Sequence, residues 1–243
     1  MRTRFLLIPI LLILSSSHFL SAAAYQPWSE SVFIHINKEF GPEAEKRVRD
    51  LHDIVVKNQN KSVDEKLLLV NDTINKLPWI ADKEHWQQTD YWATPMETLA
   101  TFGGDCEDIA IAKWVMLRHL GVPKENLRLA YVKVKATGEN HMILAYVERI
   151  DLPREQRLET TWILDNIDKR LLTATERTDL LTIYATDADG NMVVFKDSDG
   201  ELSILSVREK TKMQKLEEIK KKIDENTAFV QKLNAEQSAH SAE

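Results

Sequence analysis

Only one cysteine, Cys106, occurs among the 243 residues of the chain. A single cysteine cannot form an intramolecular disulfide, and it cannot supply the several thiolates of a cysteine-rich zinc site. Glycine and proline are also scarce, at seven residues each, which excludes a collagen-like chain and a chain made mostly of flexible linker. Cys106 is therefore either a packing residue or the centre of the protein's chemistry.

The chain also lacks an excess of positive charge. It has 32 lysines and arginines against 38 aspartates and glutamates, a formal charge of −6. This balance predicts no nucleic-acid binding, because such proteins present clustered basic surface. A hydrophobic content of 43% with 29% charged residues is typical of a soluble globular protein. The length suits one domain with a sizeable core, or one domain plus an appendage.

No apolar run is long enough for a comfortable membrane span; the longest covers residues 5–14. Arg2 and Arg4 precede this run, and Ser-Ala-Ala-Ala follows at residues 21–24. A basic head, a short apolar run and an Ala-x-Ala-like end predict a cleaved signal peptide, with an uncleaved anchor as the alternative. Cleavage after residue 24 removes both arginines and no acid, so the formal charge changes from −6 to −8.

An exported protein makes the single cysteine unusual. Exported proteins generally use cysteines in pairs, as disulfides. An unpaired thiol outside the cytoplasm is exposed to oxidants, so it needs a reason to persist.

Helical patterns fill the first half of the chain. Apolar residues recur at helical spacing over residues 43–57. Capping boxes at Ser62 and Thr94 predict two further helices, one ending at Pro78 and the other at Gly103-Gly104. The segment 105–117 is apolar nearly all round after its first turn, which predicts a buried central helix.

Strand patterns follow. An alternating segment rich in β-forming residues occurs at 127–135, and further strand-like segments occur at 141–147, 160–164, 182–185 and 192–195. A charged loop at 151–159 precedes the third strand, and Asp189-Gly190 joins the last two. Helices followed by antiparallel strands predict an α+β domain.

The C-terminal segment is different in composition. Residues 207–234 are highly charged, with Leu216, Ile223 and Val230 at roughly heptad spacing. A single apolar stripe favours an amphipathic helix packed on its own domain over a partner-binding coiled coil, and we expect the last ten residues to be frayed. The predicted organisation is a signal peptide at 1–24, a domain at 25–205 and a helix with a tail at 206–243.

Cys106 follows two glycines at the predicted start of a helix. Free N–H groups there favour a thiolate and could hold an oxyanion during acyl transfer. His141 opens the second predicted strand and Asp165 closes the third, so adjacent antiparallel strands could bring both side chains over the helix start. The result would be a Cys106–His141–Asp165 arrangement for nucleophilic catalysis. The alternative is a buried packing cysteine and an unrelated turn histidine.

Asp105, Glu107 and Asp108 surround the candidate nucleophile. Their negative charges would raise the pKa of the Cys106 thiol. Asp105 could serve as an N-cap, which would explain part of this acidity. Three carboxylates are also the oxygen ligands that calcium prefers, and a bound calcium would cancel their repulsion.

Four short segments carry a resemblance to a known family. They are Gly-Gly-Asp-Cys-Glu-Asp at 103–108, Gly-Val-Pro at 121–123, Asn-His-Met at 140–142 and Leu-Asp-Asn at 164–166. In this order the chain resembles the bacterial transglutaminase-like cysteine proteinases over roughly residues 30–200, in particular the periplasmic members that control biofilms. The resemblance implies a papain/transglutaminase-like fold, with a nucleophile helix packed on an antiparallel sheet.

The resemblance also implies the site residues. Members use a Cys-His-Asp triad, which matches Cys106, His141 and Asp165. The charged insertion at 151–159 makes the interval between the histidine and the aspartate of the triad longer than the family pattern. Asp168 is therefore an alternative to Asp165 as the third residue of the triad. The members depend on calcium held by acids beside the nucleophile. Those acids match Asp105 and Glu107, with Asp108 as a further candidate ligand.

By the same resemblance, we expect a periplasmic endopeptidase. It would cut a large surface adhesin near its N-terminus at a di-alanine-type site, which releases the adhesin and disperses the biofilm. An inner-membrane receptor for cyclic-di-GMP would sequester the protease through its periplasmic domain. Two alternatives stay open: a transglutaminase or amidase with the same triad, and a non-catalytic periplasmic adaptor that binds calcium structurally.

Overall fold

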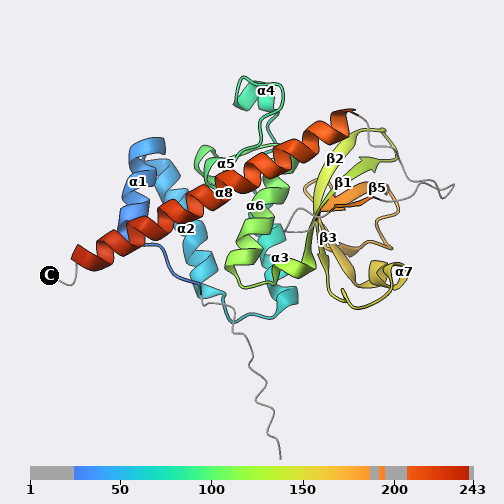
Figure 1. Cartoon of the computed structure of the whole chain (residues 1–243), viewed down its shortest axis with the longest axis horizontal. Coiled ribbons are helices and arrows are strands. Elements are labelled where there is room, and N and C mark those ends of the chain that lie inside the picture. The colour runs from blue at the N-terminus through green and yellow to red at the C-terminus, as the bar shows by residue number, and fades with distance from the viewer. Residues whose placement is uncertain (1–24, 187–191, 195–206, 241–243) are drawn as a thin grey trace, which may run out of the picture.

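Helices α1 to α6 come first in the chain and form one side of the molecule (Figure 1). A computed structural model describes residues 25–186, 192–194 and 207–240. The first six helices span Glu30–Phe40 (α1), Pro42–Lys57 (α2), Val63–Ile74 (α3), Asp82–His85 (α4), Pro95–Thr101 (α5) and Cys106–His119 (α6). The four helices expected from periodicity and capping are confirmed as α2, α3, α5 and α6, whereas α1 and α4 are not among the predicted helices.

Two capping boxes begin α3 and α5, as the sequence predicts. The Glu65 N–H donates to Ser62 Oγ at 3.3 Å, and the Ser62 N–H donates back to the Glu65 carboxylate at 3.0 Å. Thr94 and Glu97 make the same reciprocal pair, at 3.3 and 2.7 Å. These bonds satisfy backbone N–H groups that have no partner inside the helix, so each helix has a defined start.

In the described residues, six antiparallel strands form one sheet in the order β4-β3-β2-β1-β5-β6. The strands span Leu127–Val134 (β1), Asn140–Val147 (β2), Thr161–Leu164 (β3), Leu172–Thr173 (β4), Leu180–Thr186 (β5) and Met192–Val194 (β6). All five predicted strands are present, and β4 is additional. The charged loop at 151–159 contains a short helix, Arg154–Arg157 (α7), and the start of a 3-10 turn, Leu158–Thr160. The predicted Asp189-Gly190 turn lies outside the described residues.

Helix α6 packs against β1 and β2 and occupies the centre of the molecule (Figure 1). Its Ile109 and Leu117 are buried in one cluster with Leu129 of β1 and Leu144 of β2. Burial of each such side chain stabilises the fold by about 1.5–3 kcal/mol. The prediction of a buried central helix on an antiparallel sheet is confirmed, and with it the α+β class.

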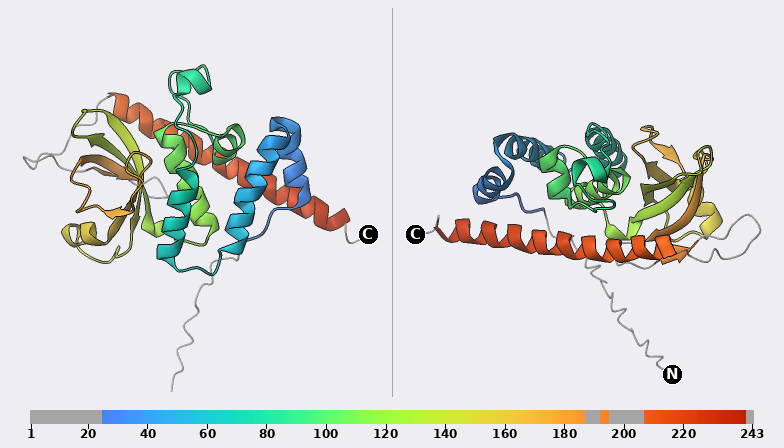
Figure 2. Two further views of the ribbon diagram at one scale, coloured as in Figure 1. Left: turned by 180° about the vertical axis from the view of Figure 1, so that it is seen from behind. Right: turned by 90° about the horizontal axis from the view of Figure 1, so that it is seen from above.

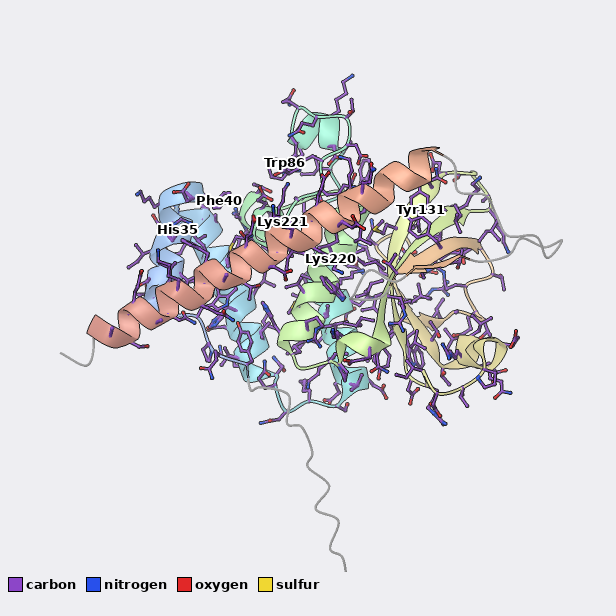
Figure 3. All side chains as sticks on the ribbon, in the orientation of Figure 1. His35, Phe40, Trp86, Tyr131, Lys220 and Lys221 are labelled. Atoms are coloured by element: carbon purple, nitrogen blue, oxygen red, sulfur yellow. The ribbon has the colours of Figure 1, made fainter. Side chains whose placement is uncertain are left out.

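Helix α8, Val207–His240, lies along the helices and the sheet (Figures 1 and 2). Leu216 and Ile219 are buried in the same cluster as α6. At the other end, His35 of α1 lies beside α8, with its ring centre 4.7 Å from that of Phe229 (Figure 3). The prediction that this helix packs on its own chain is confirmed.

The last ten residues, which the sequence predicts to be frayed, are helical as far as His240, where α8 ends. The Ser29 N–H donates to Asn234 Oδ1 at 2.8 Å, and Ser31 Oγ donates to Gln237 at 2.9 Å. These contacts with the start of α1 order the last turns of the helix. The predicted signal peptide lies outside the described residues. Within the described ranges, no helix has the length and apolar character of a membrane span.

Candidate active site

Cys106 is the first residue of α6, and the loop before it requires glycine. A Cβ on Gly103 would lie 2.6 Å from Ile80 Cδ1, and a Cβ on Gly104 would lie 2.6 Å from the Asp108 carboxylate. The Ile80 N–H donates to the Gly104 carbonyl at 3.0 Å, so this loop packs against a second chain segment. The glycines therefore bring the backbone close to both neighbours and set where α6 begins.

The Cys106 thiol is partly buried between α6 and the start of β2. Its Sγ donates to Glu107 Oε2 at 2.9 Å, and the Met142 N–H donates to it. Because Met142 directly follows His141, the thiol lies at the same end of β2 as the predicted histidine. Burial, then the charges of Glu107 and Asp105, raise the pKa of the Cys106 thiol well above its usual value.

His141 and Asp165 are brought together by strand register. Leu144 pairs with Leu164 across the antiparallel strands β2 and β3, so the chain beyond Leu164 runs beside the start of β2. His141 Nε2 lies 2.7 Å from Asp165 Oδ1, and both side chains are buried. The substitute, Asp168, pairs instead with Arg170 at 2.6 Å on the surface. The contact to His141 therefore comes from Asp165 and not from Asp168.

Several donors surround the Asp165 carboxylate. Burial alone would raise its pKa, but hydrogen bonds from His141, the Ile167 N–H and Arg177 outweigh burial and hold the pKa well below its usual value. An ionised carboxylate only accepts hydrogen bonds, so His141 Nε2 carries the proton between them. The ring nitrogen left to accept a proton is Nδ1.

Acidic side chains cluster at the same helix start. Carboxylate oxygens of Asp82, Asp105 and Asp108 lie within 4.8 Å of one another. The ligand atoms of a second group, Asp105, Cys106 and Glu107, also lie within 4.8 Å of one another. Of the three predicted ligands, Asp105 belongs to both groups, Glu107 lies with the thiol, and Asp108 lies with Asp82. Asp82 is an addition that sequence reasoning missed.

The cluster is suited to a calcium ion. Asp105 is the N-cap residue by position, but its side chain makes no capping bond, so helix capping does not explain its carboxylate. Asp105 Oδ1 and Asp108 Oδ2 are buried and have no hydrogen-bond partner. Burial and the neighbouring carboxylates raise the pKa of Asp105 to about 10 and that of Asp108 to about 8. Buried, mutually repelling carboxylate oxygens are the donor set that calcium would satisfy.

Asp82 is the first residue of α4, and its side chain contacts the loop that follows this helix. Its Oδ2 accepts from the Tyr91 N–H at 2.6 Å, while Asp108 Oδ1 accepts from the Ala93 N–H at 2.8 Å. Both bonds fold the segment before α5 onto the start of α6. Nothing in the residues around Asp82 distinguishes it from a surface aspartate, yet it is only 6% exposed. Only its place in the fold identifies it.

A cavity of about 350 Å³ lies elsewhere, between α8 and the helical side. Apolar residues such as Leu51, Met116 and Val230 line it, together with His52. Cys106 is not among its lining residues. The partly exposed Cys106 thiol at the start of α6 therefore lies outside this cavity.

Comparison with known proteins gives a consistent result. The sequence model described as bacterial transglutaminase-like cysteine proteinase BTLCP matches residues 34–182. No curated protein sequence matches the chain.

Three solved structures of Legionella pneumophila LapG are similar to the chain. One shares 24% identity at a TM-score of 0.62 and covers 82% of this chain and 99% of that one. An EGTA-treated form shares 23% identity at a TM-score of 0.63 and covers 82% of this chain and 100% of that one. A calcium-bound form shares 26% identity at a TM-score of 0.57 and covers 76% of this chain and 97% of that one. The likeness confirms the expected transglutaminase-like fold.

Proposed function

The chain belongs to the bacterial transglutaminase-like cysteine proteinases, and on this basis we propose that it is a calcium-dependent cysteine endopeptidase of the periplasm. The observation that carries the proposal is the 2.7 Å contact between His141 and Asp165 at the strand end that also holds the Cys106 thiol. A partly buried thiol, an imidazole and an ionised carboxylate in this order are the parts of a nucleophilic triad.

The reaction begins at the thiol. His141 Nδ1 takes the proton from Cys106 Sγ, because Nε2 is occupied in donating to Asp165. The sulfur then attacks the scissile carbonyl carbon, and backbone N–H groups at the start of α6 donate to the oxyanion. The imidazolium returns its proton to the leaving amine. A water molecule, deprotonated by the same imidazole, then hydrolyses the thioester and restores the thiol.

Calcium would be held by Asp82, Asp105 and Asp108, with Glu107 close by. When bound, the ion supplies positive charge that offsets the carboxylates beside Cys106 and so favours the thiolate. The similar Legionella LapG structures carry the descriptions calcium-bound and EGTA-treated, which supports a role for the ion in this family.

The proposed substrate is a large surface adhesin cut near its N-terminus at a di-alanine-type site. Cleavage would release the adhesin from the cell and disperse the biofilm. The proposed inhibitor is the periplasmic domain of an inner-membrane cyclic-di-GMP receptor, so the protease itself would not bind the nucleotide. The predicted signal peptide supports export, and a role as nucleophile supplies the reason for an unpaired thiol in an exported protein.

The test uses the chain from Tyr25 onward and fragments from adhesin N-termini that contain a di-alanine. We expect cleavage with added calcium, loss of cleavage in EGTA, and no cleavage by Cys106→Ala at unchanged circular dichroism. Mass spectrometry of the products identifies hydrolysis of a backbone amide. A new isopeptide bond or a deamidated side chain would instead establish the transglutaminase or amidase alternative. An active Cys106→Ala variant would refute the proposal.

A further inference from the structure

Arg177 lies in the loop between β4 and β5 and is only 4% exposed. Its Nη2 donates to Asp165 Oδ2 at 2.8 Å. Its Nε and Nη2 also donate to the two oxygens of Asp179, at 2.9 and 2.8 Å. His141 and Arg177 therefore bind opposite oxygens of the same buried carboxylate.

We propose that Arg177 is a positioning residue, which orients the Asp165 carboxylate and, through it, the imidazole of His141. This inference rests on the proposed protease function. The carboxylate of an aspartate rotates over a broad range about its last bond, so one hydrogen bond does not define its plane. Arg177 on Oδ2 and the Ile167 N–H on Oδ1, at 2.9 Å, define that plane. Oδ1 then faces Nε2 of His141, which leaves Nδ1 for the thiol.

The main chain of Asp165 is held independently of its side chain. Asn75 Nδ2, at the end of α3, donates to the Asp165 carbonyl at 2.8 Å. Asn75 also donates to Asn71 Oδ1, which accepts from the buried Lys113 at 2.9 Å. Lys113 acts on Asp165 only through its charge, since its hydrogen bond goes to Asn71. Arg177 is thus the cation that both neutralises the carboxylate and fixes its direction.

Charge explains why an arginine is suited to this position. A carboxylate as buried as Asp165 is costly without a counter-charge and tends to protonate or to seek other donors. The guanidinium stays charged and has donors in a fixed plane, so Arg177 can serve Asp165 and Asp179 together. The Asp179 side chain is 51% exposed, and its two bonds hold the guanidinium from the solvent side.

The first experiment compares Arg177→Met with the unmodified mature chain. We expect kcat for peptide cleavage to fall by about 10- to 100-fold, because a misplaced base loses the near-attack geometry. KM should stay within about twofold, since Arg177 does not touch substrate. Alkylation of Cys106 by iodoacetamide should slow as well. The matched control is Arg149→Met, which removes an exposed Arg149–Asp151 pair and should change neither rate.

A double-mutant cycle separates positioning from folding. If Arg177 acts through Asp165, Arg177→Met should cause no further loss of alkylation rate in an Asp165→Asn background. An equal loss in both backgrounds would make Arg177 only a structural residue and overturn the inference. Unchanged kcat in folded Arg177→Met would overturn it too. Should Arg177→Met fail to fold, Asp179→Asn and Arg177→Lys replace it: intermediate loss of kcat supports positioning, and full activity of both refutes it.

The two proposals fail in different ways. If the mature chain cleaves no peptide but Arg177→Met still slows the alkylation of Cys106 through Asp165, the positioning role stands and the protease function falls. If the mature chain and Arg177→Met cleave peptide equally well, the protease function stands and the positioning role falls.

Discussion

The carboxylates of Asp82 and Asp105 lie within 4.8 Å of each other, although one begins the short helix α4 and the other precedes α6. Asp108 completes the group. Two like charges at this distance inside a protein repel each other strongly unless a cation lies between them or a proton neutralises one. The proximity of Asp82 to Asp105 links α4, which precedes the nucleophile by some distance in the sequence, to the proposed calcium dependence.

The Asp82 carboxylate should contribute directly to calcium binding. We expect Asp82→Asn to weaken calcium affinity by about tenfold or more and to raise the calcium concentration needed for half-maximal cleavage. Isothermal titration calorimetry and a calcium titration of activity measure the two effects. Glu84→Gln, an exposed acid on the same short helix, is the control and should match the unmodified protein. Equal affinities for all three proteins would remove Asp82 from the site.

Gly104 should be required for the same site on steric grounds. A Cβ there would lie 2.6 Å from the Asp108 carboxylate, so Gly104→Ala must displace that side chain. We expect weaker calcium binding and lower kcat, both measured as for Asp82→Asn. Gly138→Ala serves as the control, because nothing lies within 4 Å of its Cβ and its φ of +73° makes the substitution costly only to stability. Normal calcium affinity in Gly104→Ala would contradict the steric argument.

Asp165 should be essential for the orientation of His141. In Asp165→Asn an amide replaces the carboxylate, so it can donate to Nε2 and favour the wrong tautomer of the imidazole. We expect kcat to fall by on the order of 10³- to 10⁴-fold, with the fold retained. Asp168→Asn is the matched control, since Asp168 pairs with Arg170 on the surface. The idea fails if the two variants have similar kcat.

The buried Lys113 should make the free energy of unfolding depend on pH between its folded pKa of about 7 and its usual pKa of 10.5. Burial lowers its pKa from 10.5 to about 7, so between these values the unfolded chain binds a proton that the folded chain has lost. At Lys113 the unfolded state then binds more protons, so this residue contributes a rise in the free energy of unfolding with pH, by up to about 1.4 kcal/mol per unit. Asp105 and Asp108, whose pKa values are raised to about 10 and about 8, contribute in the opposite sense in every variant, so the test is a difference between variants. In urea denaturation at pH 7 to 10, the free energy of unfolding of Lys113→Met should rise less, or fall more, with pH than that of the unmodified protein. The exposed Lys76→Met should follow the unmodified protein, and parallel pH profiles for all three proteins would contradict the assignment.

Local signals were sufficient for much of the fold. The capping boxes at Ser62 and Thr94 define helix starts within four residues of sequence, and both are present. The β-forming residues of β1 and the apolar run of β2 likewise need no distant partner to be recognised. Helix α1 has no such signal, because the residue three positions after its N-cap Ser29 is Val32 and not a glutamate or glutamine. One-turn helices such as α4 depend on the contacts of the whole chain.

The candidate site also contains residues that the local sequence identifies and one that only the tertiary structure identifies. Cys106 is recognisable from the glycines and acids next to it, and His141 from its place at the start of a strand. The choice of Asp165 over Asp168 needed the register of β2 and β3, which side chains far apart in sequence determine together. The sequence offered both aspartates as candidates and could not distinguish them by contact.

The sequence by itself determined the helix and strand pattern, the unpaired thiol at a helix start and the acids on either side of it, because these depend on residues adjacent in the chain. Only the tertiary structure decided that Asp82 joins the acidic cluster and that Arg177 binds the far side of Asp165. Asp82 lies at the start of α4 and Arg177 in the loop between β4 and β5, and both reach the site only through the packing of the chain around α6 and the sheet. Convergence of distant side chains is a property of that packing, and no local pattern encodes it.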